Sequence, residues 1–595
     1  TLYNKIGFDK KSSMYWGKEL ANMALNISSN IVASEKGREL VQHGSALFPI
    51  ACYAEDLSSY SVAWHWHEEF EFILAALGPI HVDVNKTRLT LQTGQGVFIN
   101  SGALHAVEPT EGRALLHSGV FQPRLVGGMD TVFWQKLIRP LLQPGTPPFF
   151  LLDEAVPWQR QGLLCLREAW KGVADESFDY ENRVRYHLTA ALRLLITQCV
   201  SGKVKVSEQE QIASERMKQM LRYVEEHYAE ELTVEKLAGC VALSESACLR
   251  SFRQFLGITP IQYVKQFRVE KAAELLRSGE LVALPTETVY GIAADARNGE
   301  AVKKIFEAKG RPQDNPLIVH ICGMEMLHGI VSEVPERAKK LAAAFWPGPL
   351  TMVMPRGPEV SEVTCAGLDT VGVRMPSHPV VQAVIKASGV AFAAPSANLS
   401  GKPSPTNAQD VFTDMDGRLP LILDGGECDV GVESTVVSVV GEKPTLFRPG
   451  HITLEDLERA LGEEVEVSKA ILEKLPEGAV VRSPGMKYKH YAPKADVTLL
   501  NGTFAQFRAY VDAHKDENPS CLCFTGESAK LDVPCVEYGR EGDGADQAKH
   551  IFRSLRALDE QGDGVVYARC PQKDGLSMAV YNRLIRAAAF RVIDL

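Results

Sequence analysis

The pattern of apolar residues changes twice along this chain of 595 residues, and these changes limit what it can fold into. Between about 45 and 125, short apolar runs alternate with turn residues, which is typical of an antiparallel barrel or sandwich. Amphipathic helical patterns follow, and after about residue 280 strand and helix patterns alternate, as in α/β folds. Since a domain holds about 100–200 residues, we expect a multidomain protein of roughly three to five domains.

The composition excludes several classes of protein. Apolar residues make up 45% and charged residues 23%, as in globular proteins. The 64 Lys and Arg against 74 Asp and Glu give a net charge of −10, which argues against a chain that coats nucleic acid over its whole surface, although a local basic patch is compatible with it. We find no run of 18 apolar residues, no apolar core of a secretory signal and no CxxC pair. We therefore expect a cytoplasmic protein with reduced cysteines and no membrane partner.

Four polar residues stand out in the strand-rich segment. His65, His67 and Glu71 are separated by even numbers of residues, so on one continuous strand they share a face. His105 follows a later turn and is a fourth candidate ligand. The segments that contain these residues resemble the two metal motifs of cupins: HWHEEFE (65–71) and GVFINSGALH (96–105).

The alternative is that these side chains line an effector pocket, as in the barrels of AraC-type regulators. Helical patterns follow at about 158–171, 181–200 and 212–228, and this context favours the regulator. We therefore interpret the four residues as pocket-lining groups and expect no bound metal.

Two short helical patterns with a tight turn between them follow at 233–257. Ser244 is a good N-cap for the second helix and Gly257 a good stop. This arrangement predicts a helix-turn-helix, and the alternative is two packed helices of a larger α domain. In a helix-turn-helix, the second helix would present three side chains to DNA: Ser246, Arg250 and Arg253.

The segment GITPIQYVKQFRVEKAAELLRSG (257–279) resembles the AraC family after its first helix-turn-helix. Members of that family carry two such motifs, but here the chain continues as LVALPTETVYG (281–291) and the second motif is missing. We interpret the chain as a fusion whose junction lies in a helix that both parents share. With a single motif, only weak contact with DNA is expected.

Cationic residues follow the next predicted helix. Lys309 and Arg311 flank Gly310 at its end, and Asn315 comes shortly after. Two cations and an amide at a helix exit suit a polyphosphate. No GxxxxGK[ST] loop occurs in the chain, so a nucleotide would be held by a device other than a P-loop.

Further clusters of hydroxyls, amides and cations lie on predicted turns: FWPGPLT (345–351), LDTVGVRMPSHP (368–379), APSANLSGKPSPT (394–406), GVESTVV (431–437) and FRPG (447–450). Together with LVALPTETVYG (281–291) and the segment that contains Lys309, Arg311 and Asn315, and in this order, they resemble the YrdC-like domain of L-threonylcarbamoyl-AMP synthases. That resemblance implies a twisted α/β sheet with a large basic cavity. The family usually has a short strand before the AAELL helix, and here regulator residues replace it.

The end of the chain extends this resemblance. SPGMKYKHYAP (483–493) resembles the linker of two-domain synthases, in which Tyr488 and Tyr491 are predicted to close over the site as a lid or to pack between domains. Residues 495–595 alternate strand and helix like the Rossmann-like C-terminal domain of those enzymes. They contain no GxGxxG after the first strand, so no dinucleotide is expected there.

The resemblance implies an enzyme, a nucleotidyltransferase. It would join L-threonine, bicarbonate or CO2, and ATP into L-threonylcarbamoyladenylate and pyrophosphate, the first step toward threonylcarbamoyladenosine in tRNA. Expected partners include double-stranded RNA and downstream tRNA-modifying enzymes, and Mg²⁺ is expected with ATP, held mainly by the nucleotide. The alternatives are an AraC-type transcription regulator, and a YrdC-like nucleotide or RNA binder without activity.

The resemblance also implies a role for each matching residue. The threonine site would contain Thr288, His320, Arg374 and Ser434, with Arg374 pairing the carboxylate. Lys309 and Arg311 would be catalytic. The ATP site would contain Lys309, Arg311, Asn315, Thr370, Ser396, Asn398, Ser404, Arg448 and Tyr491.

These patterns divide the chain into seven parts: an N-terminal extension (1–35), a cupin-like sensor domain (36–157), connecting helices (158–209), a single AraC-type helix-turn-helix (210–267), a YrdC-like catalytic domain (268–482), a linker or lid (483–494) and a Rossmann-like C-terminal domain (495–595).

Overall fold

The computed structural model describes residues 44–45, 47–57, 62–109, 112–143, 145–200, 207–473, 491, 494–562 and 564–595. The predicted extension at 1–35 and most of the predicted linker lie outside these residues. The chain divides into two compact units, Thr1–Phe267 and Arg268–Leu595. This division falls at the residue where the sequence analysis begins the catalytic domain.

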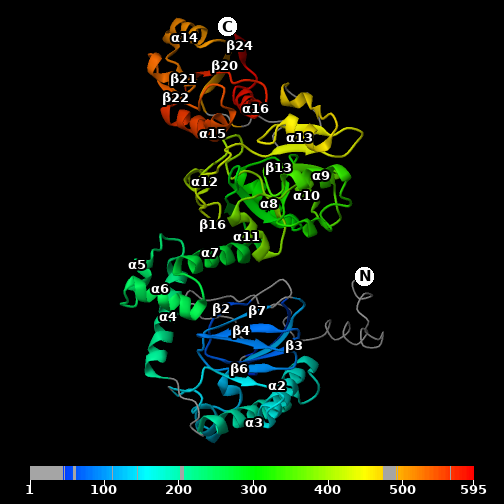
Figure 1. The fold of residues 1–595 in the computed structure, drawn as a ribbon, viewed down its shortest axis with the longest axis vertical. Coiled ribbons are helices and arrows are strands. Elements are labelled where there is room, and N and C mark those ends of the chain that lie inside the picture. The colour runs from blue at the N-terminus through cyan, green and yellow to red at the C-terminus, as the bar shows by residue number, and fades with distance from the viewer. Residues whose placement is uncertain are drawn as a thin grey trace. The chain divides into compact units, whose positions relative to one another are not determined.

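The N-terminal unit begins with two antiparallel sheets (Figure 1). The first sheet has the order β1-β8-β3-β6-β9 and the second the order β2-β7-β4-β5. Apolar side chains such as Ile73, Val82 and Val97 are buried in a core that both sheets share. The strands are β1 (Ile50–Asp56), β2 (Val62–His65), β3 (Phe70–Leu77), β4 (Ile80–Val84), β5 (Thr87–Leu91), β6 (Gly96–Ile99), β7 (His105–Pro109), β8 (Leu115–Phe121) and β9 (Phe149–Leu152).

Two long helices, α2 (Pro157–Asp175) and α3 (Tyr180–Val200), pack against the first sheet. The helices themselves were predicted from the sequence at about 158–171 and 181–200. Leu163 and Leu166 of α2 pack against the sheet in one buried cluster. Trp170 of the same helix donates a hydrogen bond from Nε1 to the backbone oxygen of Tyr53 on β1, at 3.1 Å.

A helical module, residues 207–267, completes this unit. It contains α4 (Glu208–His227), α5 (Val234–Gly239), α6 (Glu245–Leu256) and the start of α7 (Pro260–Arg277). Ser244 caps α6 by accepting a hydrogen bond from the Ala247 amide, and Gly257 ends it with a φ of 70°. The two short helices predicted between 233 and 257 are therefore present.

The C-terminal unit contains a mixed sheet of ten strands with the order β16-β10-β11-β15-β12-β14-β13-β17-β18-β19. Its strands are β10 (Val282–Leu284), β11 (Gly291–Asp295), β12 (Ile318–His320), β13 (Leu350–Pro355), β14 (Thr370–Arg374), β15 (Phe392–Ala393), β16 (Leu421–Ile422), β17 (Thr435–Ser438), β18 (Thr445–Arg448) and β19 (Glu466–Val467). Its helices are α8 (Gly299–Lys309), α9 (Glu336–Phe345), α10 (Glu362–Cys365), α11 (Pro379–Ser388), α12 (Ala408–Met415) and α13 (Leu454–Leu461).

The junction helix packs against one edge of this sheet. Ala272 and Leu276 of α7 are buried with Val282 and Leu284 of β10. Strand β10 lies between β11 and β16, so β16 forms the edge of the sheet here. The regulator-like sequence of α7 therefore supplies apolar side chains that the sheet needs at this edge.

A second, all-parallel sheet lies near the C-terminus, with the order β22-β21-β23-β20-β24. The elements are β20 (Asp496–Asn501), α14 (Phe504–Ala513), β21 (Ser520–Cys523), β22 (Cys535–Glu537), α15 (Gly544–Gln561), β23 (Val565–Arg569), α16 (Ser577–Ala587) and β24 (Val592–Asp594). Its core includes Val289 and Val432 of the preceding domain, so the two domains share buried apolar surface. In the described part of the chain, no helix combines the length and apolar character needed to cross a bilayer.

Candidate functional site

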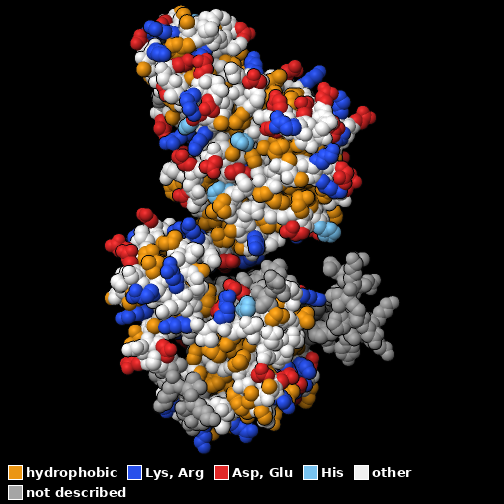
Figure 2. All heavy atoms as spheres, in the orientation of Figure 1, with side chains coloured by type: hydrophobic (Ala, Val, Ile, Leu, Met, Phe, Trp, Pro, Cys, Tyr) orange, Lys and Arg blue, Asp and Glu red, His pale blue; other side chains and the backbone are white. Residues whose placement is uncertain are grey.

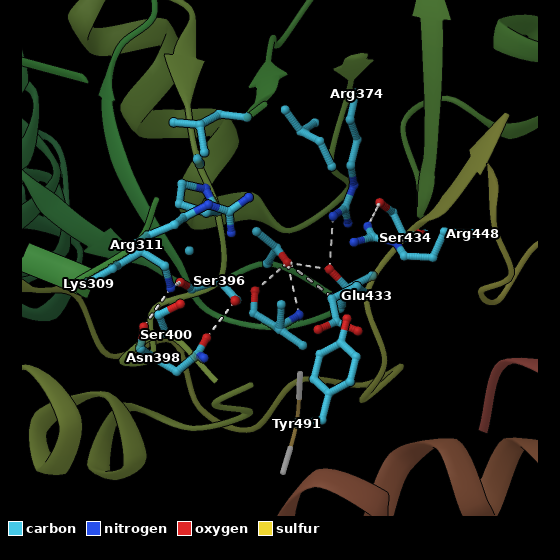
Figure 3. A pocket seen from close by; sticks show the side chains of 18 of the residues that line it. Lys309, Arg311, Arg374, Ser396, Asn398, Ser400, Glu433, Ser434, Arg448 and Tyr491 are labelled. Carbon is cyan, nitrogen blue, oxygen red and sulfur yellow. Dashed lines mark hydrogen bonds between the residues drawn. The ribbon is translucent and has the colours of Figure 1, made fainter. Parts of the chain in front are cut away.

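A cavity that is open to solvent lies in the C-terminal unit, where several strands of the ten-stranded sheet end (Figure 3). Ten of the residues that the sequence analysis assigned to substrates line it: Thr288, Lys309, Arg311, His320, Arg374, Ser396, Asn398, Ser434, Arg448 and Tyr491.

The cavity has a strong excess of positive charge. Its described lining includes the cations of Lys309, Arg311, Arg374, Lys402 and Arg448, but a single carboxylate, that of Glu433. Glu433 is already engaged, because its Oε1 accepts from the Ser404 hydroxyl at 2.5 Å and its Oε2 from Arg583 Nε at 3.0 Å. Such a cavity favours anionic ligands.

Lys309 and Arg311 lie on one side of the cavity in Figure 3, near Ser396 and Asn398. Lys309 ends α8, and its Nζ donates to the backbone oxygens of Ser396 and Asn398, the latter at 2.5 Å. Burial, assisted by the nearby charge of Arg311, holds the pKa of Lys309 well below its usual range. Because two buried cations repel each other, an anion that binds between them stabilises their charged forms.

Arg374, at the end of β14, lies on the opposite side of the cavity, with Ser434 and Arg448 (Figure 3). Its Nη1 donates to the Thr288 hydroxyl at 2.9 Å, and its Nη2 lies 2.7 Å from Glu287 Oε1. Burial alone would raise the pKa of Glu287, but the charge of Arg374 outweighs it and the pKa is lowered. Arg374 and Glu287 therefore form a buried ion pair.

Arg448, at the end of β18, orients Ser434. Its Nε donates to the backbone oxygen of Ser434 at 3.0 Å and its Nη2 to the hydroxyl of the same residue at 3.1 Å. The Ser434 hydroxyl also lies 2.8 Å from the Thr351 hydroxyl. Burial lowers the pKa of Arg448, so an anion at this point would strengthen its charged form.

His320 ends β12 beside Arg374. Burial, together with the charge of Arg374, lowers the pKa of His320 to about 3. The imidazole is therefore neutral at neutral pH. It can donate or accept a hydrogen bond at the cavity wall but adds no positive charge there.

The C-terminal domain contributes to the wall of the cavity indirectly. Arg583 on α16 is fully buried and pairs with Glu433, while its Nη1 donates to the backbone oxygen of Pro449 at 2.5 Å. Tyr491 lines the cavity, and its ring packs on Phe552 of α15, with 5.1 Å between the ring centroids. Tyr488 lies outside the described residues. Tyr491 thus both contacts the cavity and packs between the domains.

Three residues assigned to the ATP site do not line this cavity. Ser404 is buried and binds Glu433 instead. Thr370 is at the far end of β14, about 13 Å along the strand from Arg374, and faces a smaller cavity beside Pro316. The Asn315 side chain is buried outside the cavity wall, although its backbone oxygen accepts from Arg311. These three lie outside the cavity wall, and their assignment to ATP stays a prediction.

The sequence analysis missed several residues of the site. Glu287 and Glu433 lie within the quoted motifs PTETVYG and GVESTVV. Each stands in the chain next to a residue assigned to threonine, Thr288 or Ser434, and this position was the available signal. Lys402 lies in the quoted segment APSANLSGKPSPT. Arg583 had no local signal, because its partner Glu433 is 150 residues away in the sequence.

The described lining offers no carboxylate pair for Mg²⁺. Glu433 is held by Arg583 and Ser404, and the other charged side chains are cations. Hard divalent cations prefer oxygen ligands, so this donor set fits Mg²⁺ only as an ion carried by phosphate oxygens.

The N-terminal unit contains a second group of buried polar side chains. The candidate ligand atoms of His65, His67, Glu71 and His105 all lie within 4.8 Å of one another. In the helical module, Ser246, Arg250 and Arg253 are exposed on α6. Lysine and arginine side chains are visible over this module in Figure 2.

The sequence of the C-terminal unit matches known protein families. A family model described as "Telomere recombination" matches residues 274–450, and one described as "Threonylcarbamoyl-AMP synthase, C-terminal domain" matches 452–589. A threonylcarbamoyl-AMP synthase from Pyrococcus abyssi is 44% identical over 334 residues, which are 56% of this chain and 96% of that protein. The chain belongs to the threonylcarbamoyl-AMP synthase family. A synthase from Bacillus subtilis is 42% identical and is covered over its full length by 58% of this chain.

A solved structure supports the same fold. The crystal structure of P. abyssi Sua5 complexed with L-threonine is 41% identical, with a TM-score of 0.53, and the match covers 56% of this chain and 96% of that one. The prediction of a threonylcarbamoyl-AMP synthase, an enzyme of the nucleotidyltransferase type, is thereby confirmed.

The N-terminal unit has different relatives. A family model described as "AraC-like ligand binding domain" matches residues 47–133. An uncharacterized HTH-type transcriptional regulator of B. subtilis, YdeC, is 29% identical over 257 residues, which are 42% of this chain and 86% of that protein. The prediction that the chain joins a regulator-like part to a synthase is confirmed.

Proposed function

We propose that the cavity of the C-terminal unit binds ATP, L-threonine and bicarbonate or CO2, and converts them into L-threonylcarbamoyladenylate and pyrophosphate. The observation that carries this proposal is the positive charge of the cavity. Five cationic side chains line it, of which Arg374 is paired with Glu287, and the one carboxylate of the described lining, Glu433, is paired with Arg583. Both ATP and threonine carry anionic groups that need such cations. The threonine complex of the P. abyssi relative supports the choice of amino acid.

Threonine would bind beside Arg374. A guanidinium can pair a carboxylate through two hydrogen bonds, and Thr288 and Glu287 orient this one by contacting its Nη1 and Nη2, each of which carries a second N–H for the ligand. His320, whose imidazole is neutral, and Ser434 line the same cavity and would bind the amine and hydroxyl groups of the amino acid.

The phosphates of ATP would lie between Lys309, Arg311 and Arg448. Threonine's amine adds to CO2 and loses a proton, which gives a carbamate. A carbamate oxygen then attacks the α-phosphorus, the bond from this phosphorus to the bridging oxygen breaks, and pyrophosphate leaves with the electron pair. Because both reactants are anions, the cations contribute by holding them in line and by stabilising the charge that builds up on the leaving group.

Mg²⁺ would enter with ATP and would neutralise part of the triphosphate charge. The residues of the chain would then bind the complex through its remaining phosphate oxygens. Tyr491 would cover the cavity and exclude water from the labile carbamate. We further propose that the product passes to tRNA-modifying enzymes, and binding of double-stranded RNA remains a prediction.

The test is pyrophosphate release by the full chain. We expect pyrophosphate only when ATP, threonine and bicarbonate are all present, and labelled bicarbonate should appear in the adenylate product. Release without threonine would contradict the proposal, because it would mean that the cavity hydrolyses ATP or uses another acceptor.

We also propose a second function, DNA binding by the helical module as a single AraC-type helix-turn-helix. The observation that favours it is the exposure of Ser246, Arg250 and Arg253 on one capped helix. Since one motif makes few contacts, binding should be weak and should fall steeply with salt. Fluorescence anisotropy with a random-sequence DNA library checks this, and nanomolar, sequence-selective binding at physiological salt would contradict it.

The parallel strand order β22-β21-β23-β20-β24, with α14, α15 and α16 between its strands, supports a Rossmann-like assignment of the C-terminal domain. We propose that this domain acts through Arg583 and Tyr491, which shape one wall of the cavity.

A further inference from the structure

A loop of the cavity wall, residues 396–403, is held from two directions. From one side, Lys309 Nζ donates to the backbone oxygen of Asn398 at 2.5 Å. From the other side, Arg556 on α15 of the C-terminal domain donates from Nη2 to the backbone oxygen of Pro403 at 2.5 Å. The C-terminal domain therefore contacts a loop whose residues line the cavity.

Lys402 in this loop shares a buried carboxylate with Arg556. The Lys402 Nζ donates to Asp414 Oδ1 at 2.9 Å, and Arg556 Nη2 donates to Asp414 Oδ2 at 2.8 Å. The Asp414 side chain on α12 is fully buried, whereas that of Lys402 is 40% exposed and lines the cavity. These three residues form a polar chain that runs from the cavity to α15.

The charge of Asp414 is balanced from both ends of this chain. Burial alone would raise the pKa of Asp414, but the hydrogen bonds and charges of Arg556 and Lys402 outweigh it, and the pKa is lowered. Asp414 is therefore ionised at neutral pH. A second carboxylate oxygen, Asp410 Oδ2, lies 3.7 Å from Arg556 Nε, which is beyond hydrogen-bond distance.

This sharing leaves Lys402 able to bind an anion. A lysine that alone neutralises a carboxylate keeps little attraction for a further anion. Here the arginine holds the second oxygen of Asp414 and supplies a permanent charge, so the carboxylate is neutralised without the lysine. An ammonium has three N–H donors, of which Asp414 takes one, and the others can donate to a ligand in the cavity.

The position of Lys402 indicates which ligand it would meet. Its backbone oxygen accepts from Asn398 Nδ2 at 2.8 Å. Asn398 lies near Lys309 in Figure 3, on the side of the cavity opposite Arg374. This is the side to which the proposed reaction assigns the phosphates of ATP.

We propose that Lys402 binds a phosphate group of ATP, and that Arg556 is a positioning residue which keeps this lysine available by neutralising Asp414. Arg556 thus influences the cavity although it is not part of the described lining. This inference rests on the proposed synthase function, since it takes ATP as the ligand of the cavity. The alternative is that the three residues only fasten the two domains together.

The first experiment measures ligand binding by the full chain with titration calorimetry. Lys402→Met should weaken the binding of ATP with Mg²⁺ by about 10–100-fold, because a charged hydrogen bond to phosphate is lost. Threonine binding should not change. Lys443→Met is the matched control, since Lys443 forms an exposed pair with Glu464, and it should bind both ligands like the wild type. Unchanged ATP binding in Lys402→Met, or equal losses for both ligands, would overturn the proposal.

The second experiment tests the role of Arg556. Arg556→Met should weaken ATP binding by about 3–10-fold, since Asp414 then pairs with Lys402 alone. Adding Asp414→Asn should restore the binding, because the amide oxygen still accepts from Lys402 but carries no charge. Arg553→Met is the matched control on the same helix, where Arg553 forms an exposed pair with Glu427, and it should leave ATP binding unchanged.

The double variant Arg556→Met/Asp414→Asn separates the two explanations. If the residues only fasten the domains, this variant has lost both ionic links and should bind ATP no better than Arg556→Met, which would overturn the role of Arg556. The double variant also serves if Arg556→Met does not fold, because it leaves no charge at either position. ATP binding within about threefold of the wild type is then expected, and a loss of about tenfold or more would overturn the proposal.

Failure of this inference can be told apart from failure of the proposed reaction. If the wild-type chain releases pyrophosphate only with threonine present, but Lys402→Met binds ATP like the wild type, the reaction stands and this role of Lys402 is wrong. If the wild-type chain binds no ATP, both are wrong.

Discussion

The cavity of the C-terminal unit and the polar cluster of the barrel both bury ionisable groups, but with opposite balance. In the cavity, Glu433 and Glu287 are each paired with an arginine, and further cations remain on the wall. In the barrel, Glu71 faces imidazoles whose protons point to backbone oxygens. The first arrangement leaves an excess of positive charge that favours an anion, whereas in the second the carboxylate contacts imidazoles instead of arginines.

This difference shows that the partners of the buried carboxylates indicate the charge of the expected ligand. An arginine always carries its charge, so a carboxylate beside it is neutralised and the remaining cations define the site. An imidazole, in contrast, exists in a neutral and a charged form, so a carboxylate among imidazoles has partners whose charge is not fixed. The predictions that follow test this contrast from the side of the cavity.

The largest effect is expected at the ion pair of Arg583 and Glu433. Arg583→Met leaves a buried carboxylate without its cation, which should lower the stability of the C-terminal unit by about 3–5 kcal/mol. Calorimetric unfolding of the full chain measures it. Arg553→Met is the matched control, since Arg553 on α15 forms an exposed pair with Glu427, which should contribute at most about 1 kcal/mol.

The double variant Glu433→Gln/Arg583→Met should recover part of this loss, because neither side chain at these two positions then carries a charge. The pKa of Glu433 is lowered, since the charges of Arg583 and Arg448 outweigh the effect of burial. Its contribution to stability is therefore present above the ordinary pKa of about 4.5 and is lost as pH falls through the lowered value. Equal losses of stability in Arg583→Met and Arg553→Met would show that the buried pair of Arg583 and Glu433 contributes no more than an exposed pair.

The second prediction separates the two sides of the cavity. Arg374→Ala should weaken threonine binding by about 2–4 kcal/mol and ATP binding much less, because the lost fork pairs the amino acid carboxylate. Arg374→Lys keeps the charge beside Glu287 but not the fork, and it should still weaken threonine. Titration calorimetry with each ligand measures both, and Arg297→Ala, an exposed arginine paired with Glu359, is the control. Equal losses for both ligands would contradict the assignment.

The sequence predicted those parts of the site that local patterns encode. The sequence placed the cations at 309 and 311 at the end of a helix that stops at glycine, and the structure has them there. The single continuous strand expected for HWHEEFE is wrong, because β2 ends at His65 and Glu71 lies on β3, so packing of separate strands brings these residues together. A motif does not show which end of its strand faces the cavity. Arg374 lines the cavity, whereas Thr370, which was assigned to ATP, lies at the other end of β14. Long-range pairs such as Glu433 and Arg583 depend on the packing of two domains, which no local pattern reports.

The third prediction concerns protons at the phosphate side. Because the pKa of Lys309 is well below its usual range, part of its charge is lost at a lower pH than for an ordinary lysine. A bound polyphosphate favours the charged form, so ATP binding should take up protons and weaken as pH rises through the lowered pKa. Calorimetry in two buffers of different ionisation enthalpy measures this uptake, and Lys309→Met should abolish it. Uptake that persists in this variant would assign the proton to another group.

The smallest effect is expected at His320, and here the contrast with the barrel is sharpest. With a pKa of about 3, caused by burial and the charge of Arg374, this imidazole stays neutral at every pH at which the enzyme would be assayed. The pH profile of kcat/KM between pH 5 and 9 should therefore keep its shape in His320→Gln, even if its height falls through a lost hydrogen bond of about 1 kcal/mol. If the profile has an acidic limb near pH 6 that disappears in His320→Gln, then His320 titrates in this range. The positive charge of the cavity would then not hold its pKa as low as we infer.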